Sequence, residues 1–243
     1  MACDGYLPLW NRVLLDVCTQ RDFLTPGCVL QVANLDSLIA NLQRVFGWVR
    51  SNGIAVVSLV ESHRPTEPMR EFPLHCIDNT PGQEKLPFTL LSPRTLVETD
   101  NYLSLPPDLQ ANNRQLIFRK RTRDILSNPK ADRFLTSWQP EEYIIVGVGL
   151  ERAIRGLALG LLARHKTVTV VTDACGCWSP ADAELVIRQL GAKDIRLTTV
   201  EELTRPPVVV AKRTLLRLRR SRRHHPVGSR PAKLSSRAKV ANG

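Results

Sequence analysis

Long apolar runs are missing from this chain. No apolar segment among its 243 residues approaches the roughly 20 residues that a membrane-spanning helix needs. The first residues, MACDGYLPLWNRVLL, lack the basic, apolar and small-residue order of a signal peptide. Cysteine is also scarce, and six in a chain of this length are too few for a disulfide scaffold. We therefore expect a cytoplasmic protein with reduced thiols and no membrane partner.

Acidic residues are absent from the last part of the chain. Residues 211–243 contain eleven Lys or Arg and no Asp or Glu, so they carry the whole net charge of +11 and residues 1–210 balance to zero. Such a block cannot bury enough apolar surface to fold by itself. We expect a folded domain over 1–210 and a disordered basic tail over 211–243.

Two interpretations of the tail stay open. It is either a solvated segment that aids solubility, or a segment that binds the phosphates of nucleic acid or an acidic partner. In the second case the candidate residues are Arg217, Arg219, Arg220, Arg222 and Arg223.

The rest of the chain alternates short apolar segments with amphipathic helical patterns. The apolar segments predict six strands, at 12–17, 54–60, 115–119, 143–148, 167–172 and 195–199. Helices are expected over 34–50, from 129, over 151–164 and over 180–190, with Asn34 and Asn128 as N-caps and Gly53 as a stop. This order predicts a three-layer, doubly wound α/β fold with a six-stranded, mainly parallel sheet.

The segment between His63 and Asn113 breaks the alternation. It contains eight prolines and little periodicity, which indicates a long irregular excursion instead of further sheet. The pair of cysteines in CGC, Cys175 and Cys177, is spaced too closely for a CxxC site, so we interpret both as structural.

Four segments contain recognisable motifs. DVCTQRDFLTPG begins at Asp16, and ESHRPTEPMREFPLHCIDNTPGQEK begins at Glu61 with an acidic-x-His pair and a later Pro-x-His-Cys. QLIFRKRTRDILSNP has Lys120 at the end of a strand, and VGVGLERAIRGLALGLLARH joins a strand to a helix through a glycine turn. Their order and spacing resemble the isochorismatase-like cysteine hydrolases, especially the nicotinamidase-related amidases.

The resemblance implies a Cys nucleophile at the head of a helix, an Asp base and a Lys. Lys120 is retained, whereas Cys18 stands at the base position and Ala153 at the nucleophile position. Gly149, Leu150 and Ala153 fall on the turn that would receive an oxyanion. Asp16 lies two residues before the base position, and we do not expect it to replace the base. The main interpretation is an isochorismatase-like fold with impaired catalysis.

The resemblance also implies a divalent metal, Zn, Mn or Fe, held by Glu61, His63 and His75. These three residues would then form part of a small-molecule pocket. The alternative is that both histidines are ordinary loop residues. Relatives with this fold assemble as oligomers, so a homo-oligomer is expected by resemblance.

Cys18 permits several interpretations. Next to Lys120 it would have a stabilised thiolate, and would serve as a relocated nucleophile, a redox-sensitive site or a fourth zinc ligand. The preferred interpretation is a small buried residue, because free cysteine is among the most buried residue types. Two alternative functions therefore stay open: an active hydrolase of small amides that uses Cys18 or a metal-bound water, and a nucleic-acid or acidic-partner binding protein that uses its basic tail.

Overall fold

The computed structural model of the chain describes residues 9–68, 72–98, 103–105, 108–122 and 124–206. The tail predicted after residue 210, with its five candidate arginines, lies outside the described residues, and so does its predicted boundary. Within the described ranges no helix is both long enough and apolar enough to cross a membrane.

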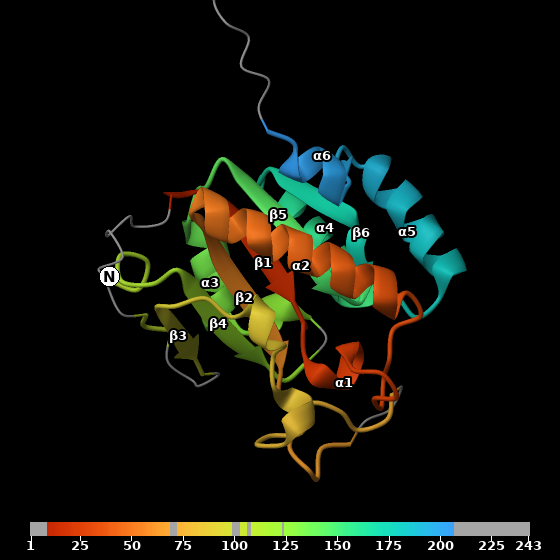
Figure 1. The fold of residues 1–243 in the computed structure, drawn as a ribbon. Helices are drawn as coiled ribbons and strands as arrows, with labels where there is room; N and C mark the ends of the chain where they lie inside the picture. The colour runs from red at the N-terminus through yellow and green to blue at the C-terminus, as the bar shows by residue number, and fades with distance from the viewer. Residues whose placement is uncertain (1–8, 69–71, 99–102, 106–107, 123, 207–243) are drawn as a thin grey trace, which may run out of the picture. The chain divides into compact units, whose positions relative to one another are not determined.

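One parallel sheet forms the centre of the fold (Figure 1). Its order is β3-β4-β2-β1-β5-β6-β7, and every neighbouring pair is parallel. The strands are β1 (Leu9–Val17), β2 (Ile54–Glu61), β3 (Arg94–Val97), β4 (Gln115–Lys120), β5 (Glu142–Val148), β6 (Val168–Gly176) and β7 (Arg196–Thr198). The predicted α/β class is confirmed.

The predicted number of six strands is wrong because β3 was not expected. This strand has four residues and lies at the edge of the sheet, directly after Pro93, inside the proline-rich excursion. Arg94 and Leu96 are exposed and Val97 alone is buried. A strand this short, with one buried residue, gives no alternating pattern that could be recognised.

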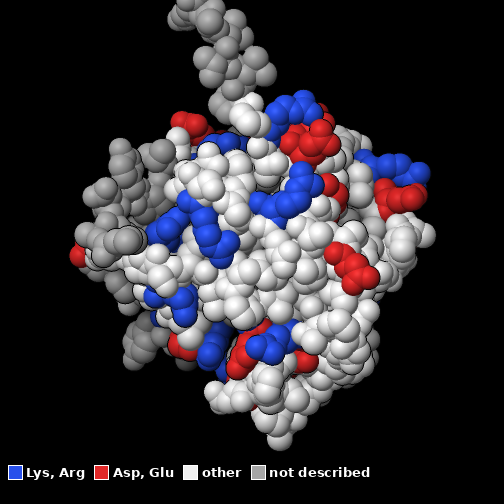
Figure 2. Space-filling view, viewed as in Figure 1, with Lys and Arg blue, Asp and Glu red and all other residues white. Residues whose placement is uncertain are grey.

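Helices cover both faces of the sheet. Figure 1 shows α2 on one face, with α6 beside it, and α3 and α4 behind the sheet; α5 packs next to α4 and β7. These elements are α1 (Arg21–Leu24), α2 (Leu35–Asn52), α3 (Pro129–Ser137), α4 (Arg155–Ala163), α5 (Pro180–Gly191) and α6 (Val200–Thr204). On the face that carries α2, Lys and Arg side chains lie among Asp and Glu, as the balanced charge of residues 1–210 predicts (Figure 2).

Two of the three predicted helix ends are confirmed. The side chain of Asn128 accepts hydrogen bonds from Lys130 N and Ala131 N, and Gly53 ends α2 in a left-handed conformation. Asn34 precedes α2 but makes no side-chain cap. Its amide instead donates to Cys175 O and accepts from Cys177 N, at 3.0 and 3.1 Å, and so ties the end of β6 to the start of α2.

The predicted helix over 151–164 begins differently. Leu150–Ile154 form a π-helical turn, in which Ile154 N donates to Gly149 O five residues back, and α4 follows from Arg155. Gly149 precedes this turn with φ 89°, a conformation that glycine adopts at low cost.

A buried ion pair connects the proline-rich excursion to β1. Lys85 Nζ lies 2.5 Å from Asp16 Oδ2, and the same oxygen accepts a 2.8 Å hydrogen bond from Ser58 Oγ. Asp16 therefore has its own partners within the fold, Lys85 and Ser58.

The sheet reverses its order between β1 and β5, which are direct neighbours although they are far apart in the sequence. In open parallel sheets, ligands bind beyond the carboxyl ends of the strands at such a switch point. At this point Gly147 lies against Val17, and a Cβ on Gly147 would stand 2.0 Å from Val17 O. The centre of the sheet requires glycine here.

We expect Gly147→Ala to destabilise the fold by more than about 3 kcal/mol, because its φ of 122° and the contact with Val17 both exclude a side chain. Gly156→Ala is the matched control. A Cβ on Gly156 meets nothing within 4 Å, so this change should stabilise α4 by about 0.5–1 kcal/mol. Urea unfolding of both variants measures the difference, and equal midpoints would contradict the assignment.

Candidate active site

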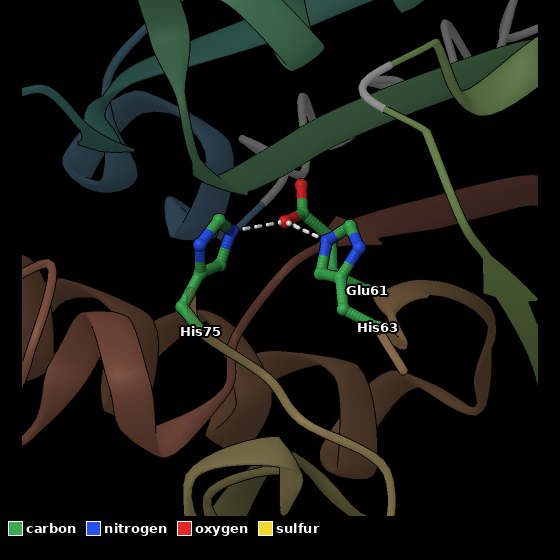
Figure 3. A group of neighbouring side chains, drawn as sticks. All are labelled: Glu61, His63 and His75. Atoms are coloured by element: carbon green, nitrogen blue, oxygen red, sulfur yellow. Dashed lines mark hydrogen bonds and ion pairs between the residues drawn. The ribbon is translucent and has the colours of Figure 1, made fainter. Parts of the chain in front are cut away.

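The carboxylate of Glu61 is the centre of a buried polar cluster at the end of β2. Its Oε1 lies 2.5 Å from Lys120 Nζ, from the end of the neighbouring β4. Its Oε2 lies 2.7 Å from His75 Nε2 and 3.4 Å from His63 Nε2. Figure 3 shows both imidazole rings pointing at this one oxygen. The three residues predicted as a metal site, and the retained Lys120, are therefore brought together.

Gln20 positions this carboxylate through the backbone. Its side-chain Oε1 accepts from Glu61 N, and its Nε2 donates to Glu61 O, both at 2.8 Å. The same Nε2 also donates to Gln83 O at 2.9 Å, which joins the excursion to the site. Gln20 belongs to the DVCTQRDFLTPG motif, but the sequence alone does not predict its hydrogen bonds to Glu61 and Gln83.

Charge and burial act against each other at the ion pair. Burial favours a higher pKa for Glu61, but the Lys120 ammonium and hydrogen bonds from His63 and His75 outweigh it and hold the pKa well below its ordinary value. Burial alone would lower the pKa of Lys120, yet the charge and the hydrogen bond of the Glu61 carboxylate raise it. Both groups therefore stay charged, with Lys120 1% exposed.

Cys18 directly follows β1 and lies next to this pair, but it does not become a thiolate. Its Sγ lies 3.7 Å from Glu61 Oε1, the oxygen that Lys120 already contacts. Burial raises the pKa of Cys18 to about 12; the Lys120 charge opposes this rise and Glu61 reinforces it. Burial and the Glu61 charge together outweigh the Lys120 charge, so the structure favours the interpretation of Cys18 as a small buried residue over that of a stabilised thiolate. A protonated, buried thiol is a poor nucleophile.

The donor set fits a divalent cation. His75 Nδ1 lies 2.7 Å from Pro73 O, a pure acceptor, so this nitrogen carries the proton. In the neutral ring the lone pair of Nε2 then faces a carboxylate oxygen, which requires a proton or a cation between them. Two ligands of a tetrahedral zinc ion lie about 3.4 Å apart. Glu61 Oε2 and His63 Nε2 have this separation, 3.4 Å, whereas Glu61 Oε2 and His75 Nε2 are in direct contact at 2.7 Å and would move apart to admit an ion. The candidate ligand atoms of the three residues lie within 4.8 Å of one another.

Ala153 lines a pocket next to this cluster, on the turn that follows β5. A methyl group therefore stands where the resemblance places the nucleophilic sulfur. Of the predicted oxyanion turn, Gly149 donates its N–H to Gly176 O at 3.0 Å, so that amide is already used within the fold. Leu150 is 2% exposed and does not line the pocket. Gly149 therefore lines the pocket with its amide already used, and the Leu150 side chain is buried away from the pocket.

The pocket encloses about 450 Å³, including its open mouth, and has an aromatic wall. Phe23 contacts His75 edge to face with ring centroids 5.3 Å apart, and Phe72 contacts Trp178 at the same separation. Glu151, on the π turn, accepts from Trp178 N at 2.8 Å and so fixes this wall. Sequence reasoning missed Phe72 and Trp178, which come from irregular segments far apart in the chain.

The isochorismatase domain matches residues 13–202 of this chain. The chain belongs to the isochorismatase family. Nicotinamidase of Escherichia coli is a relative with 26% identity over 207 residues, which cover 79% of this chain and 96% of that protein.

Solved structures of other proteins share the fold. Pyrazinamidase of Pyrococcus horikoshii, in complex with zinc, has a TM-score of 0.61 at 23% identity and covers 78% of this chain and 99% of its own. An isochorismatase family protein from Desulfovibrio vulgaris has a TM-score of 0.63 at 21% identity, with coverages of 80% and 97%. The superfamily predicted from the four motifs is thus confirmed.

We expect Glu61→Gln to cost about 3–5 kcal/mol of folding free energy in metal-free buffer, because it leaves the Lys120 charge buried without a carboxylate. The double variant Glu61→Gln, Lys120→Met should be more stable than the sum of the single changes predicts. Glu201→Gln, at the exposed pair with Arg205, is the control and should cost less than about 1 kcal/mol. Additive effects of the two buried changes, measured by urea unfolding, would contradict the pairing.

Proposed function

We propose that this isochorismatase-family protein is a catalytically impaired hydrolase that retains a small-molecule pocket and a divalent-metal site. The observation that carries the proposal is Ala153, whose methyl group lines the pocket at the nucleophile position. The residue at the base position, Cys18, is a buried thiol with a raised pKa and no carboxylate. Without both groups, cysteine-based acyl transfer loses orders of magnitude in rate.

The residues that remain have a binding role. Glu61, His63 and His75 would hold the metal, and Lys120 keeps the Glu61 carboxylate charged and oriented. Zinc is supported by this set of one carboxylate and two imidazoles, and by the zinc complex of the P. horikoshii relative. Such an ion, when bound, supplies a Lewis-acidic position for a ligand atom. The aromatic wall of Phe23, Phe72 and Trp178 holds a flat ring and excludes water.

Zinc should stabilise the protein, because an ion that binds only the folded state adds about 2.7 kcal/mol at 100 times its Kd. The measurement is the unfolding midpoint with and without ZnCl₂. Glu61→Gln and His75→Ala should abolish the increase. His165→Asn, which removes an exposed imidazole at a position with φ 58°, should keep it. An equal increase in all four proteins would disprove the site.

The wild-type protein should release no ammonia from nicotinamide or pyrazinamide above the buffer rate. The double variant Ala153→Cys, Cys18→Asp restores a nucleophile and a carboxylate, and we expect it to gain measurable turnover if the pocket is intact. Ala153→Cys alone, which lacks the base, should gain less.

Turnover by the wild-type protein would overturn the proposal. If Cys18→Ser abolished that turnover, the alternative of an active amide hydrolase with a relocated nucleophile would replace it. If chelation abolished it and Cys18→Ser did not, the metal-dependent alternative would be favoured.

A further inference from the structure

Glu67 lies next to the nitrogen of His63 that points away from the Glu61 carboxylate. Its Oε1 is 3.3 Å from His63 Nδ1, whereas His63 Nε2 faces Glu61 (Figure 3). The other oxygen of Glu67, Oε2, accepts from Arg64 N at 3.1 Å, and Glu67 N donates to Arg64 O at 3.0 Å. The turn over 64–67 therefore holds the Glu67 carboxylate beside the imidazole. The motifs and the proposed function leave Glu67 without a role.

The two histidines of the cluster differ at Nδ1. His75 Nδ1 has a backbone acceptor, Pro73 O, at 2.7 Å. His63 Nδ1 is buried and makes no aligned hydrogen bond within the described residues. The Glu67 carboxylate, at 3.3 Å, is the acceptor within its reach. A buried polar nitrogen without an aligned partner is uncommon in folded proteins and calls for an explanation.

A bound cation would determine which nitrogen of His63 carries the proton. A neutral imidazole that binds an ion through Nε2 has its proton on Nδ1. In His63 this N–H would be buried, and a buried N–H requires an acceptor. A small rotation of the Glu67 side chain, from 3.3 Å, would align the hydrogen bond. A carboxylate that accepts from a ligating imidazole fixes the ring and makes its other nitrogen a better ligand.

The charges of the cluster support the same role. Lys120 Nζ lies 2.5 Å from Glu61 Oε1 and neutralises this carboxylate. Histidines that bind a metal are neutral, so Glu61, Lys120 and the two imidazoles together offer a divalent cation no net negative charge. The side chain of Glu67 is 26% exposed and adds one negative charge directly behind His63. Such a charge attracts a cation more strongly when it is partly buried than when it is exposed.

We propose that Glu67 is a positioning residue of the metal site, which orients His63 and supplies negative charge behind it. The inference rests on the proposed metal site and adds a residue to it. Glu67 acts through His63 and does not contact the ion. Its Oε1 accepts the Nδ1 proton of the metal-loaded His63, which leaves Nε2 for the ion. Its Oε2 stays bound to Arg64 N, so the carboxylate ties the imidazole to the turn.

Competition with a chromophoric zinc chelator measures the zinc affinity of the full chain. Glu67→Ala should weaken zinc binding about 10–100-fold, the usual effect of losing a residue that orients a ligand. Glu67→Gln should have an intermediate affinity, because its amide offers one acceptor to two N–H groups, Arg64 N and His63 Nδ1. Glu84→Ala is the matched control: it removes a 60% exposed carboxylate of the same excursion, paired with Arg21 at 3.1 Å. It should change the affinity by less than about twofold, because exposed charges are screened.

Nuclear magnetic resonance of the ¹⁵N-labelled, zinc-loaded protein gives a readout that a general loss of stability would not move. The wild-type protein should show His63 protonated at Nδ1, with slow exchange of this proton. Glu67→Ala should accelerate the exchange at His63 and leave His75 unchanged, because His75 Nδ1 keeps its bond to Pro73 O. Urea unfolding in zinc-free buffer shows whether each variant is folded.

Three outcomes would overturn the inference and leave the metal site standing: unchanged zinc affinity in Glu67→Ala, an equal loss in Glu84→Ala, or exchange of the His63 proton at the wild-type rate in Glu67→Ala. If the wild-type protein bound no zinc, the inference and the metal part of the proposed function would fail together. If Glu67→Ala were unfolded without zinc, Glu67→Gln would decide. Weaker zinc binding by Glu67→Gln supports the inference, and wild-type affinity overturns it.

Discussion

The buried ion pair between Glu61 and Lys120 is the interaction on which the site depends. Its 2.5 Å contact joins the ends of β2 and β4, while the second carboxylate oxygen faces His75 and His63. An unpaired charge at this depth would cost several kcal/mol, so neither residue can change alone. Burial, reinforced by the Glu61 charge 3.7 Å away, raises the pKa of Cys18 and keeps it a neutral thiol. The Glu61 carboxylate thus contacts the Lys120 ammonium, both imidazole rings and the Cys18 sulfur.

Much of the fold could be predicted from the sequence because its signals are local. The apolar segments at 54–60 and 143–148 became β2 and β5, and Gly53 and Asn128 end and begin helices as their chemistry requires. β3 was missed because an edge strand with one buried residue has no periodic pattern. Asn34 was assigned a capping bond because its position suggested one, whereas its amide binds residues 175 and 177, about 140 positions away in the chain.

The candidate site was only partly predictable, for a different reason. Glu61, His63 and His75 could be found because they belong to a spaced motif within one segment. Arg152 and Trp178 reach the pocket only after β5 and β6 have been placed in the sheet, so no local pattern marks them. Motifs indicate which chemistry a chain has kept or lost. The residues that line the pocket are brought together by tertiary structure.

The Asp16–Lys85 contact makes the proline-rich excursion part of the structural core. Asp16 is 0% exposed in the central strand β1, and its counter-charge comes from the excursion. The irregular segment therefore supplies the positive charge that neutralises Asp16 in the sheet core. The packing of this segment is thus coupled to the folding of β1. A shortened chain without Lys85 would need a neutral residue at position 16. A deletion in this loop that removed Lys85 would therefore require a compensating change at residue 16 of β1.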